Sequence, residues 1–129
     1  SEFEVLSVAN QNDPNNNSIV LEYRNGKDKM LFMGDAGREI ETTLNVSNVD
    51  LIKIGHHGSK TSTSYNFLHE VNPSFAIISV GENNTYDHPS MDTLLNLELM
   101  NIQTYRTDLN GTIIVTSNGN TISIDSLKD

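Results

Sequence analysis

Three short apolar runs, each about the length of one β-strand, constrain the fold of this 129-residue chain most strongly. They cover residues 30–33, 51–54 and 75–80, and the third is almost continuously apolar, which indicates a strand buried on both faces. Chemically distinctive residues come directly after the first two runs: Gly34-Asp35 after one and Gly55-His56-His57 after the other. Because α/β folds build their sites where buried strands end, these polar residues are the first candidates for chemistry.

The remaining pattern predicts one α/β domain spanning residues 1–129, with a mixed β-sheet and helices packed on one face. Further strands are expected at 3–8, 18–23 and 102–106, a hairpin turn at Asn25-Gly26, and a closing hairpin formed by 111–116 and 121–125. Helices are expected at 38–44, at 64–71 and from Pro89-Ser90 onward. The last helix carries an apolar stripe made of Met91, Leu94, Leu95, Leu97 and Leu99.

Composition excludes several classes of site. The formal net charge of −9 argues against binding a polyanion by electrostatics alone, because neutralising phosphates requires Lys and Arg. With no cysteine, a metal site must use His and carboxylate ligands. No apolar run approaches the roughly 18 residues of a membrane span, and no Walker loop or nucleophile-elbow motif is present.

Four polar positions are candidates for function, and each has a plainer alternative. Asp35 is placed to bind a hard cation, or it caps the following helix. His56 and His57, bracketed by glycines, can supply a metal ligand, or they are ordinary loop residues. Adjacent residues of an extended segment point in opposite directions, so only one of them is expected to bind metal directly. His88 is a possible ligand, phosphate contact or general acid, or an exposed loop residue. His69 is expected to be structural or solvent-facing.

Taken together, the ordered motifs resemble the metallo-β-lactamase superfamily, and in particular the hydrolase domain of ComEC-type competence (DNA-uptake) proteins and its soluble relatives. The matching segments are Asn17 to Leu21, Leu31 to Ala36, Ile52 to Ser59, Pro73 to Pro89 and Tyr105 to Thr112. The resemblance implies that the chain is the C-terminal half of the αββα sandwich of that fold.

The resemblance also implies roles for individual residues. Asp35 is similar to the carboxylate that bridges two divalent metals, Zn²⁺ or Mn²⁺, and His57 is favoured over His56 as the late histidine ligand. His56 then has a supporting or catalytic role, and His88 is similar to a residue for substrate contact or proton transfer. Ser59, Asp108 and Asn110 match family positions that would lie near substrate.

One part of the family pattern is absent. The main ligand cluster, His-x-(His or Ala)-x-Asp-His, does not occur in these 129 residues. We therefore expect that the cluster belongs to an N-terminal half, that the parent protein is a metal-dependent phosphodiesterase or nuclease acting through an activated water, and that the isolated segment is weakly active or inactive. Single-stranded DNA is a possible substrate.

Other expectations stay open beside this one. The segment could instead be a non-catalytic binding or structural module of a competence or envelope protein, or part of a small-substrate enzyme such as a phosphorylcholine esterase. The resemblance implies an extracytoplasmic or membrane-associated bacterial parent, with no membrane contact by this segment itself. A half-sandwich leaves apolar surface uncovered, so a homodimer through that face is also expected.

Overall fold

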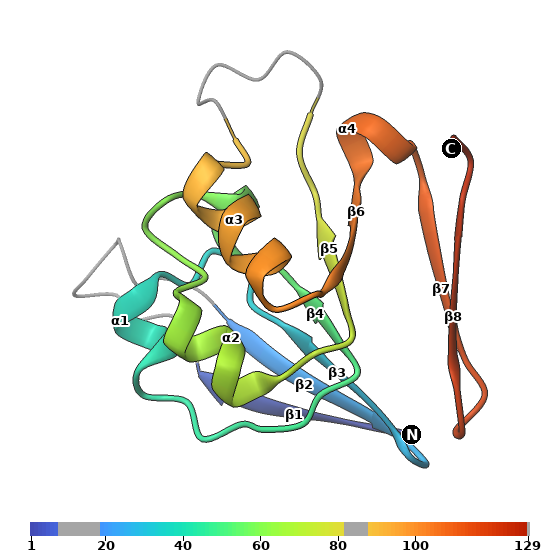
Figure 1. Ribbon diagram of the computed structural model, residues 1–129. Helices are drawn as coiled ribbons and strands as arrows, with labels where there is room; N and C mark the ends of the chain where they lie inside the picture. Colours follow the sequence, from blue (N-terminus) through green and yellow to red (C-terminus); the bar gives the residue numbers. More distant parts are fainter. Residues whose placement is uncertain (8–18, 82–87, 129) are drawn as a thin grey trace.

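The computed structural model describes residues 1–7, 19–81 and 88–128, and in this part of the chain it confirms the α/β class with a mixed sheet (Figure 1). Six strands form one sheet whose spatial order follows the chain, and two more form a separate hairpin. The strands are β1 (Glu2–Ser7), β2 (Val20–Asn25), β3 (Asp28–Phe32), β4 (Leu51–Lys53), β5 (Phe75–Ile78), β6 (Gln103–Arg106), β7 (Ile113–Ser117) and β8 (Ile122–Ser126). The helices are α1 (Arg38–Glu41), α2 (Tyr65–Val71), α3 (Met91–Leu99) and α4 (Thr107–Asn110), and a 3₁₀ turn covers Gly55–Gly58. Within these described residues, no helix is both long enough and apolar enough to cross a membrane.

The sheet changes from antiparallel to parallel at β3. β1, β2 and β3 pair antiparallel, and the predicted Asn25-Gly26 turn joins β2 to β3 with Asn25 opposite Asp28. From β3 to β6 every neighbouring pair is parallel, and the chain returns between them through α1, α2 or α3. Parallel strands need such crossovers, so the carboxyl ends of β3, β4 and β5 meet at one edge of the sheet.

The main core lies between the sheet and three helices on one of its faces, as predicted (Figure 1). The strands contribute alternate residues, because only every second side chain of a strand points to a given face. The buried residues of this core include Val20, Leu31, Ile52, Ile54, Ala76 and Ile78 from the sheet side, and Phe67, Leu68, Val71 and Leu97 from the helices.

The β7–β8 hairpin covers part of the opposite face of the sheet. Its inward residues Ile113, Val115, Ile122 and Ile124 pack with Met30, Leu51 and Ile77. Hydrogen bonds between the β2–β3 turn region and the β7–β8 turn region hold one end of the hairpin in place. The Lys27 N–H donates to the Gly119 carbonyl (2.7 Å), and the Ser117 hydroxyl donates to the buried Asp28 carboxylate (2.5 Å). The closing hairpin was expected from the sequence, but its packing against the sheet was not.

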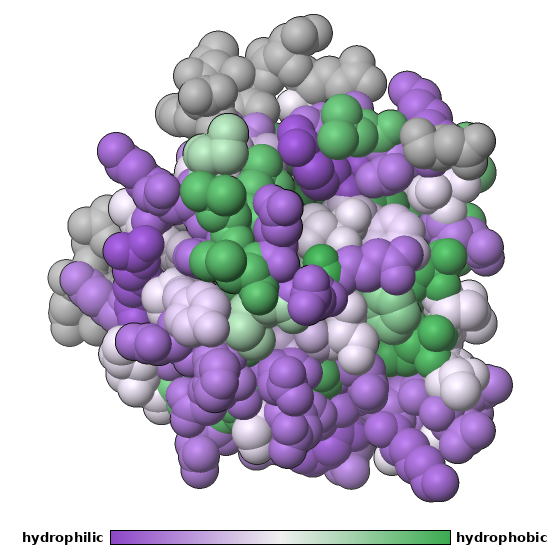
Figure 2. All heavy atoms as spheres, in the orientation of Figure 1, coloured by the Kyte–Doolittle hydropathy of each residue, from purple (hydrophilic) through white to green (hydrophobic). Residues whose placement is uncertain are grey.

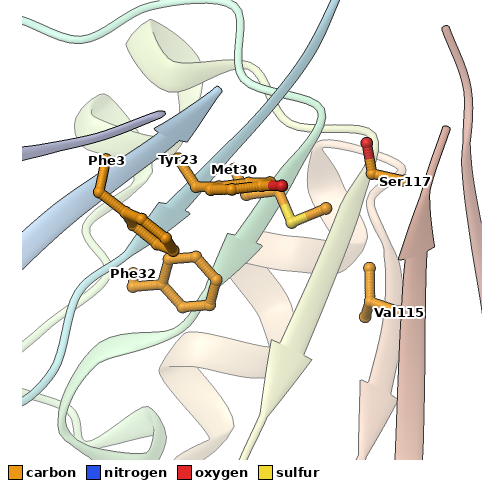
Figure 3. A pocket seen from close by; sticks show the side chains of 6 residues that line it. All are labelled: Phe3, Tyr23, Met30, Phe32, Val115 and Ser117. Carbon is orange, nitrogen blue, oxygen red and sulfur yellow. The ribbon is translucent and has the colours of Figure 1, made fainter. Parts of the chain in front are cut away.

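The hairpin leaves the β1 end of this face uncovered, where Phe3 and Val5 are 65% and 55% exposed. A pocket of about 300 Å³ lies there, between the sheet and β7 (Figure 3). Its walls combine apolar side chains with polar atoms, and the ring centroids of Phe3 and Tyr23 are 4.7 Å apart. The lining residues are Phe3, Tyr23, Met30, Phe32, Val115 and Ser117.

The structure divides the predicted apolar stripe of α3 between two sides of the helix. Leu97 is buried in the core and Leu94 is half-buried. Met91, Leu95 and Leu99, spaced four residues apart, form a ridge that faces solvent at 68%, 47% and 70% exposure. Figure 2 shows apolar side chains gathered over α3.

Several predicted boundaries differ from the observed ones. The helix expected at 38–44 ends at Glu41, and the helix α4 and the 3₁₀ turn at Gly55–Gly58 were not expected. Both unexpected elements are single turns of four residues, too short to show helical periodicity in the sequence. Val8, the polar loop at 10–17 and Asn83-Asn84 lie outside the described residues.

Glu41 explains how α1 and α2 are joined. Its carboxylate is buried (3% exposed) and accepts hydrogen bonds from the backbone N–H groups of Thr63 and Ser64, the latter at 3.1 Å. Ser64 in turn caps α2 through its hydroxyl, which accepts from the Phe67 N–H. Burial raises the pKa of Glu41, and the two backbone hydrogen bonds oppose that rise.

Replacing Glu41 with alanine is expected to lower the free energy of unfolding by about 2–4 kcal/mol, because two backbone N–H groups lose their acceptor. Urea unfolding measures this change. Glu39→Ala, an exposed position in the same helix, serves as the control and should alter stability by less than about 0.5 kcal/mol. Equal effects of the two substitutions would contradict the role given to Glu41.

Candidate functional site

The candidate site lies at the edge where the parallel strands end. Asp35 stands in the turn after β3, His57 in the 3₁₀ turn after β4, and Ser79 directly after β5. The strands are aligned in register, with Leu31 beside Ile52 and Ile52 beside Ala76, so the three segments that follow them leave the sheet side by side.

Asp35 and His57 face each other across this edge. The Asp35 Oδ1 lies 4.0 Å from the His57 Nε2. The two side chains are 69% and 56% exposed, so a ligand can reach both of them from solvent. Two residues 22 positions apart in the chain are thus brought together.

A backbone carbonyl fixes the orientation of the His57 ring. Its Nδ1 lies 2.7 Å from the Ser79 carbonyl oxygen. Because a carbonyl oxygen only accepts, the ring carries a proton on Nδ1 and donates it there. In the neutral ring, Nε2 therefore presents its lone pair toward Asp35, an arrangement suited to a cation between them; in the protonated ring the two groups form an ion pair.

The local backbone at His57 differs from the expected extended segment. Gly55–Gly58 forms a 3₁₀ turn, and His57 has a φ of 53°, in the left-handed region that few residues other than glycine adopt. The expectation that His56 and His57 point in opposite directions, as on a strand, was therefore built on the wrong local structure. The side chain of His56 lies outside the described part of the chain.

Gly58 holds the segment that carries His88 against the site. The Gly58 carbonyl accepts hydrogen bonds from the Ser90 N–H (2.8 Å) and the Thr93 hydroxyl (3.0 Å). A Cβ atom at Gly58 would lie 2.6 Å from the Pro89 Cβ, and the φ of Gly58 is 79°. These contacts of Pro89 and Ser90 place the half-buried His88 next to the turn that presents His57. Tyr86 and Asp87 of the same motif lie outside the described residues.

The three residues predicted to lie near substrate make contacts within their own turns. Ser59 is buried and its hydroxyl bonds with that of Thr61 (3.0 Å). Asp108 forms a two-point ion pair with Arg106, at 3.0 and 2.7 Å, and Asn110 accepts from the Arg106 N–H at 2.8 Å. These contacts account for the three residues structurally, and their substrate role stays a prediction.

The structure tests the helix-capping alternative for Asp35 and the structural or solvent-facing role expected for His69. Asp35 is not the N-cap of α1, because the helix begins at Arg38 with Gly37 at that position and no side-chain cap. His69 is exposed and lies near the ring of Tyr65 in the same helix, at 6.2 Å between ring centroids, which agrees with a structural or solvent-facing role.

Lys53 is a charged group at this edge that no sequence motif indicated as a candidate. It is the last residue of β4, and it is only partly accessible. Burial lowers the pKa of Lys53, and the charge of Asp35 opposes this. The one sequence signal that could have indicated Lys53 is its position as a charged residue inside the apolar run 51–54. Over residues 1–7, 19–81 and 88–128, no three His, Asp or Glu side chains come close enough to hold a metal by themselves.

Substituting alanine for Gly58 is expected to lower the free energy of unfolding by roughly 2 kcal/mol or more, since it adds both a positive-φ penalty and a clash with Pro89. Backbone amide spectra should show the largest shifts at His57 and His88. Gly81→Ala is the matched control, because a Cβ there meets nothing within 4 Å. A fully tolerated Gly58→Ala would show that Pro89 does not depend on this close approach.

No model of a known protein family matches the chain. Three curated proteins are similar to it. ComE operon protein 3 of Bacillus subtilis is 42% identical over 118 residues, which is 87% of this chain and 15% of that protein. Recombination protein 2 of Haemophilus influenzae is 33% identical over 117 residues, 88% of this chain and 15% of that protein. Competence protein ComA of Neisseria gonorrhoeae is 34% identical over 120 residues, 87% of this chain and 17% of that protein.

These relatives are much longer than the segment they share with this chain. The chain spans between 15% and 17% of their length, while the match covers 87–88% of the chain itself. The chain is therefore homologous, over most of its length, to one segment of competence and recombination proteins.

Proposed function

We propose that this segment contributes Asp35 and His57 to the divalent-metal site, for Zn²⁺ or Mn²⁺, of a hydrolase that cleaves phosphodiester bonds during DNA uptake. The observation that carries the proposal is the pairing of these two side chains, 4.0 Å apart, with the His57 ring held by the Ser79 carbonyl. We also propose that the segment is the C-terminal half of a metallo-β-lactamase-like domain. The relation to competence proteins supports the link to DNA uptake.

The donor atoms fit a shared metal ion. Two ligands that bind one tetrahedral ion at ~2.1 Å are roughly 3.4 Å apart, so a small side-chain adjustment brings the Asp35–His57 pair into range. The Nδ1 hydrogen bond to a carbonyl is the kind of outer contact that fixes a ligating histidine and leaves Nε2 for the metal. The remaining ligands would come from outside the described residues.

In this proposal the residues of the chain have distinct tasks. A bound divalent metal would supply an activated water and offset charge on the phosphate. Asp35 and His57 would hold it, with Asp35 placed to bridge two ions. His88, which Gly58 and Pro89 keep beside the His57 turn, would move a proton or contact the substrate. His56 is the second candidate for proton transfer.

A second candidate function is a non-catalytic binding module of a competence protein. It is favoured by one observation: the described residues bring together only two metal-binding side chains, fewer than the three or four that zinc requires. A small-substrate phosphoesterase remains a variant of the main proposal and differs only in its substrate. Metal binding and catalysis therefore need separate tests.

The isolated chain is expected to bind one Mn²⁺ or Zn²⁺ weakly, and calorimetric titration measures this. Asp35→Ala and His57→Ala should each weaken binding by about tenfold or more, within the range seen for loss of site residues. Glu70→Ala is the control, because this exposed carboxylate lies near the end of α2, before β5 begins, and it should leave the affinity unchanged. Identical titrations for Asp35→Ala and the unsubstituted chain would remove Asp35 from the site.

Catalysis is tested with this segment inside a full-length competence protein, supplied with Mn²⁺ or Zn²⁺ and single-stranded DNA. Cleavage should depend on the metal, and Asp35→Ala should reduce it by about a hundredfold or more, since metal activation of water is lost. Lys27→Met, an exposed position in the β2–β3 turn at the opposite end of β3, controls for folding. Metal binding without any cleavage would favour the non-catalytic module.

A further inference from the structure

The position of Lys53 in the sheet is unusual for a lysine. It ends β4, which lies between β3 and β5 near the middle of the sheet, and its register partners are the apolar Phe32 and Ile77. Its neighbours Ile52 and Ile54 point into the helix-side core, so Lys53 points to the face that carries β7–β8. Lysine is rarely placed in such surroundings without a charged partner.

Within the described part of the chain, the Lys53 ammonium has no hydrogen bond or ion pair, and Asp35 is the charge that acts on it. No fully buried side-chain nitrogen or oxygen of the described residues lacks a hydrogen-bond partner. The Nζ of Lys53 therefore reaches solvent while its stem crosses the apolar sheet face, the arrangement that lysine adopts when only its tip is available. Lys53 ends β4 at the edge of the sheet where Asp35 follows β3, and the charge of Asp35 acts on its ammonium.

We propose that Lys53 is an anion-binding residue that holds a phosphate oxygen of the substrate beside the Asp35–His57 pair. This inference rests on the proposed function and deepens it by naming the group that recognises the phosphodiester. The Asp35–His57 pair itself consists of one carboxylate and one imidazole, which attract a metal cation but not a phosphate. An ammonium with free donors at the same edge supplies the missing attraction, and a chain with a net charge of −9 needs a local cation for this.

A purely structural role for Lys53 is the rival interpretation, and the environment argues against it. Apolar residues flank Lys53 on both neighbouring strands, so a residue such as methionine would pack there without desolvating a charge. Lys53→Met should therefore maintain or raise the unfolding midpoint. A lysine that is not needed for stability at this position is explained by a ligand.

The test titrates the metal-free chain with two probes, inorganic phosphate and the dithymidine phosphodiester dTpdT. Changes in the amide chemical shifts of residues 53–59 measure the binding of each probe. Lys53→Met should weaken binding of both probes about tenfold or more, as for loss of a charge-assisted hydrogen bond, and Lys53→Arg should stay within about threefold. Lys27→Met, which removes an exposed lysine at the opposite end of the sheet, is the matched control and should change nothing.

A Mn²⁺ titration of the same variants provides a second readout with the opposite sign. Removing an ammonium beside Asp35 should strengthen Mn²⁺ binding, roughly two- to fivefold, because like charges repel. A damaged fold would weaken the binding of both phosphate and Mn²⁺, and that result would overturn the proposal. Unchanged phosphate binding in Lys53→Met would also overturn it. If the chain binds phosphate through Lys53 but takes up no Mn²⁺, the anion site stands and the metal proposal fails.

Discussion

The parallel alignment of β3, β4 and β5 is the constraint on which the rest of the structure depends. Their buried residues pair in register, for example Leu31, Ile52 and Ala76, and this pairing can form only if the chain crosses back over one face between strands. The crossovers place the helices on that face, and the shared direction brings the strand ends to one edge. The sheet brings Asp35, His57 and the Ser79 carbonyl to this edge, where the His57 ring bonds to the carbonyl and faces Asp35.

Much of this fold was predictable because its signals are local. Apolar runs of strand length and the Asn25-Gly26 turn need no information from distant residues, and they correctly predicted the strands and the first hairpin. The packing of β7–β8 was not predictable in the same way. It depends on contacts between residues about 90 positions apart, such as Asp28 with Ser117, and nothing near either residue indicates the other. Glu41 is similar, since its role is set by backbone groups 22 and 23 residues away.

The candidate site shows the same division. Asp35 and the histidine pair were predicted from glycine-bounded positions after apolar runs, and the structure brings Asp35 and His57 together. What orients His57 could not be predicted, because the acceptor is the main-chain carbonyl of Ser79, and a carbonyl has no signature in the sequence. The left-handed backbone of His57 was equally hidden, since a positive φ is uncommon for residues other than glycine and nothing in the neighbouring sequence marks it.

Electrostatics links the two proposed ligands of this edge. An acidic chain repels a polyanion at long range, so approach of a phosphodiester requires positive charge concentrated where the chemistry occurs. In the proposed site, Asp35 would attract a metal that creates part of that charge, and Lys53 would supply a fixed part. The apolar neighbours Phe32 and Ile77 make desolvation of the Lys53 charge unfavourable in the absence of an anion. Metal and lysine together would thus define a site that is weakly attractive to phosphate when empty and strongly attractive only after the metal has bound. In this proposal, metal binding before phosphate is the order expected from one carboxylate and one ammonium at the same edge of the sheet.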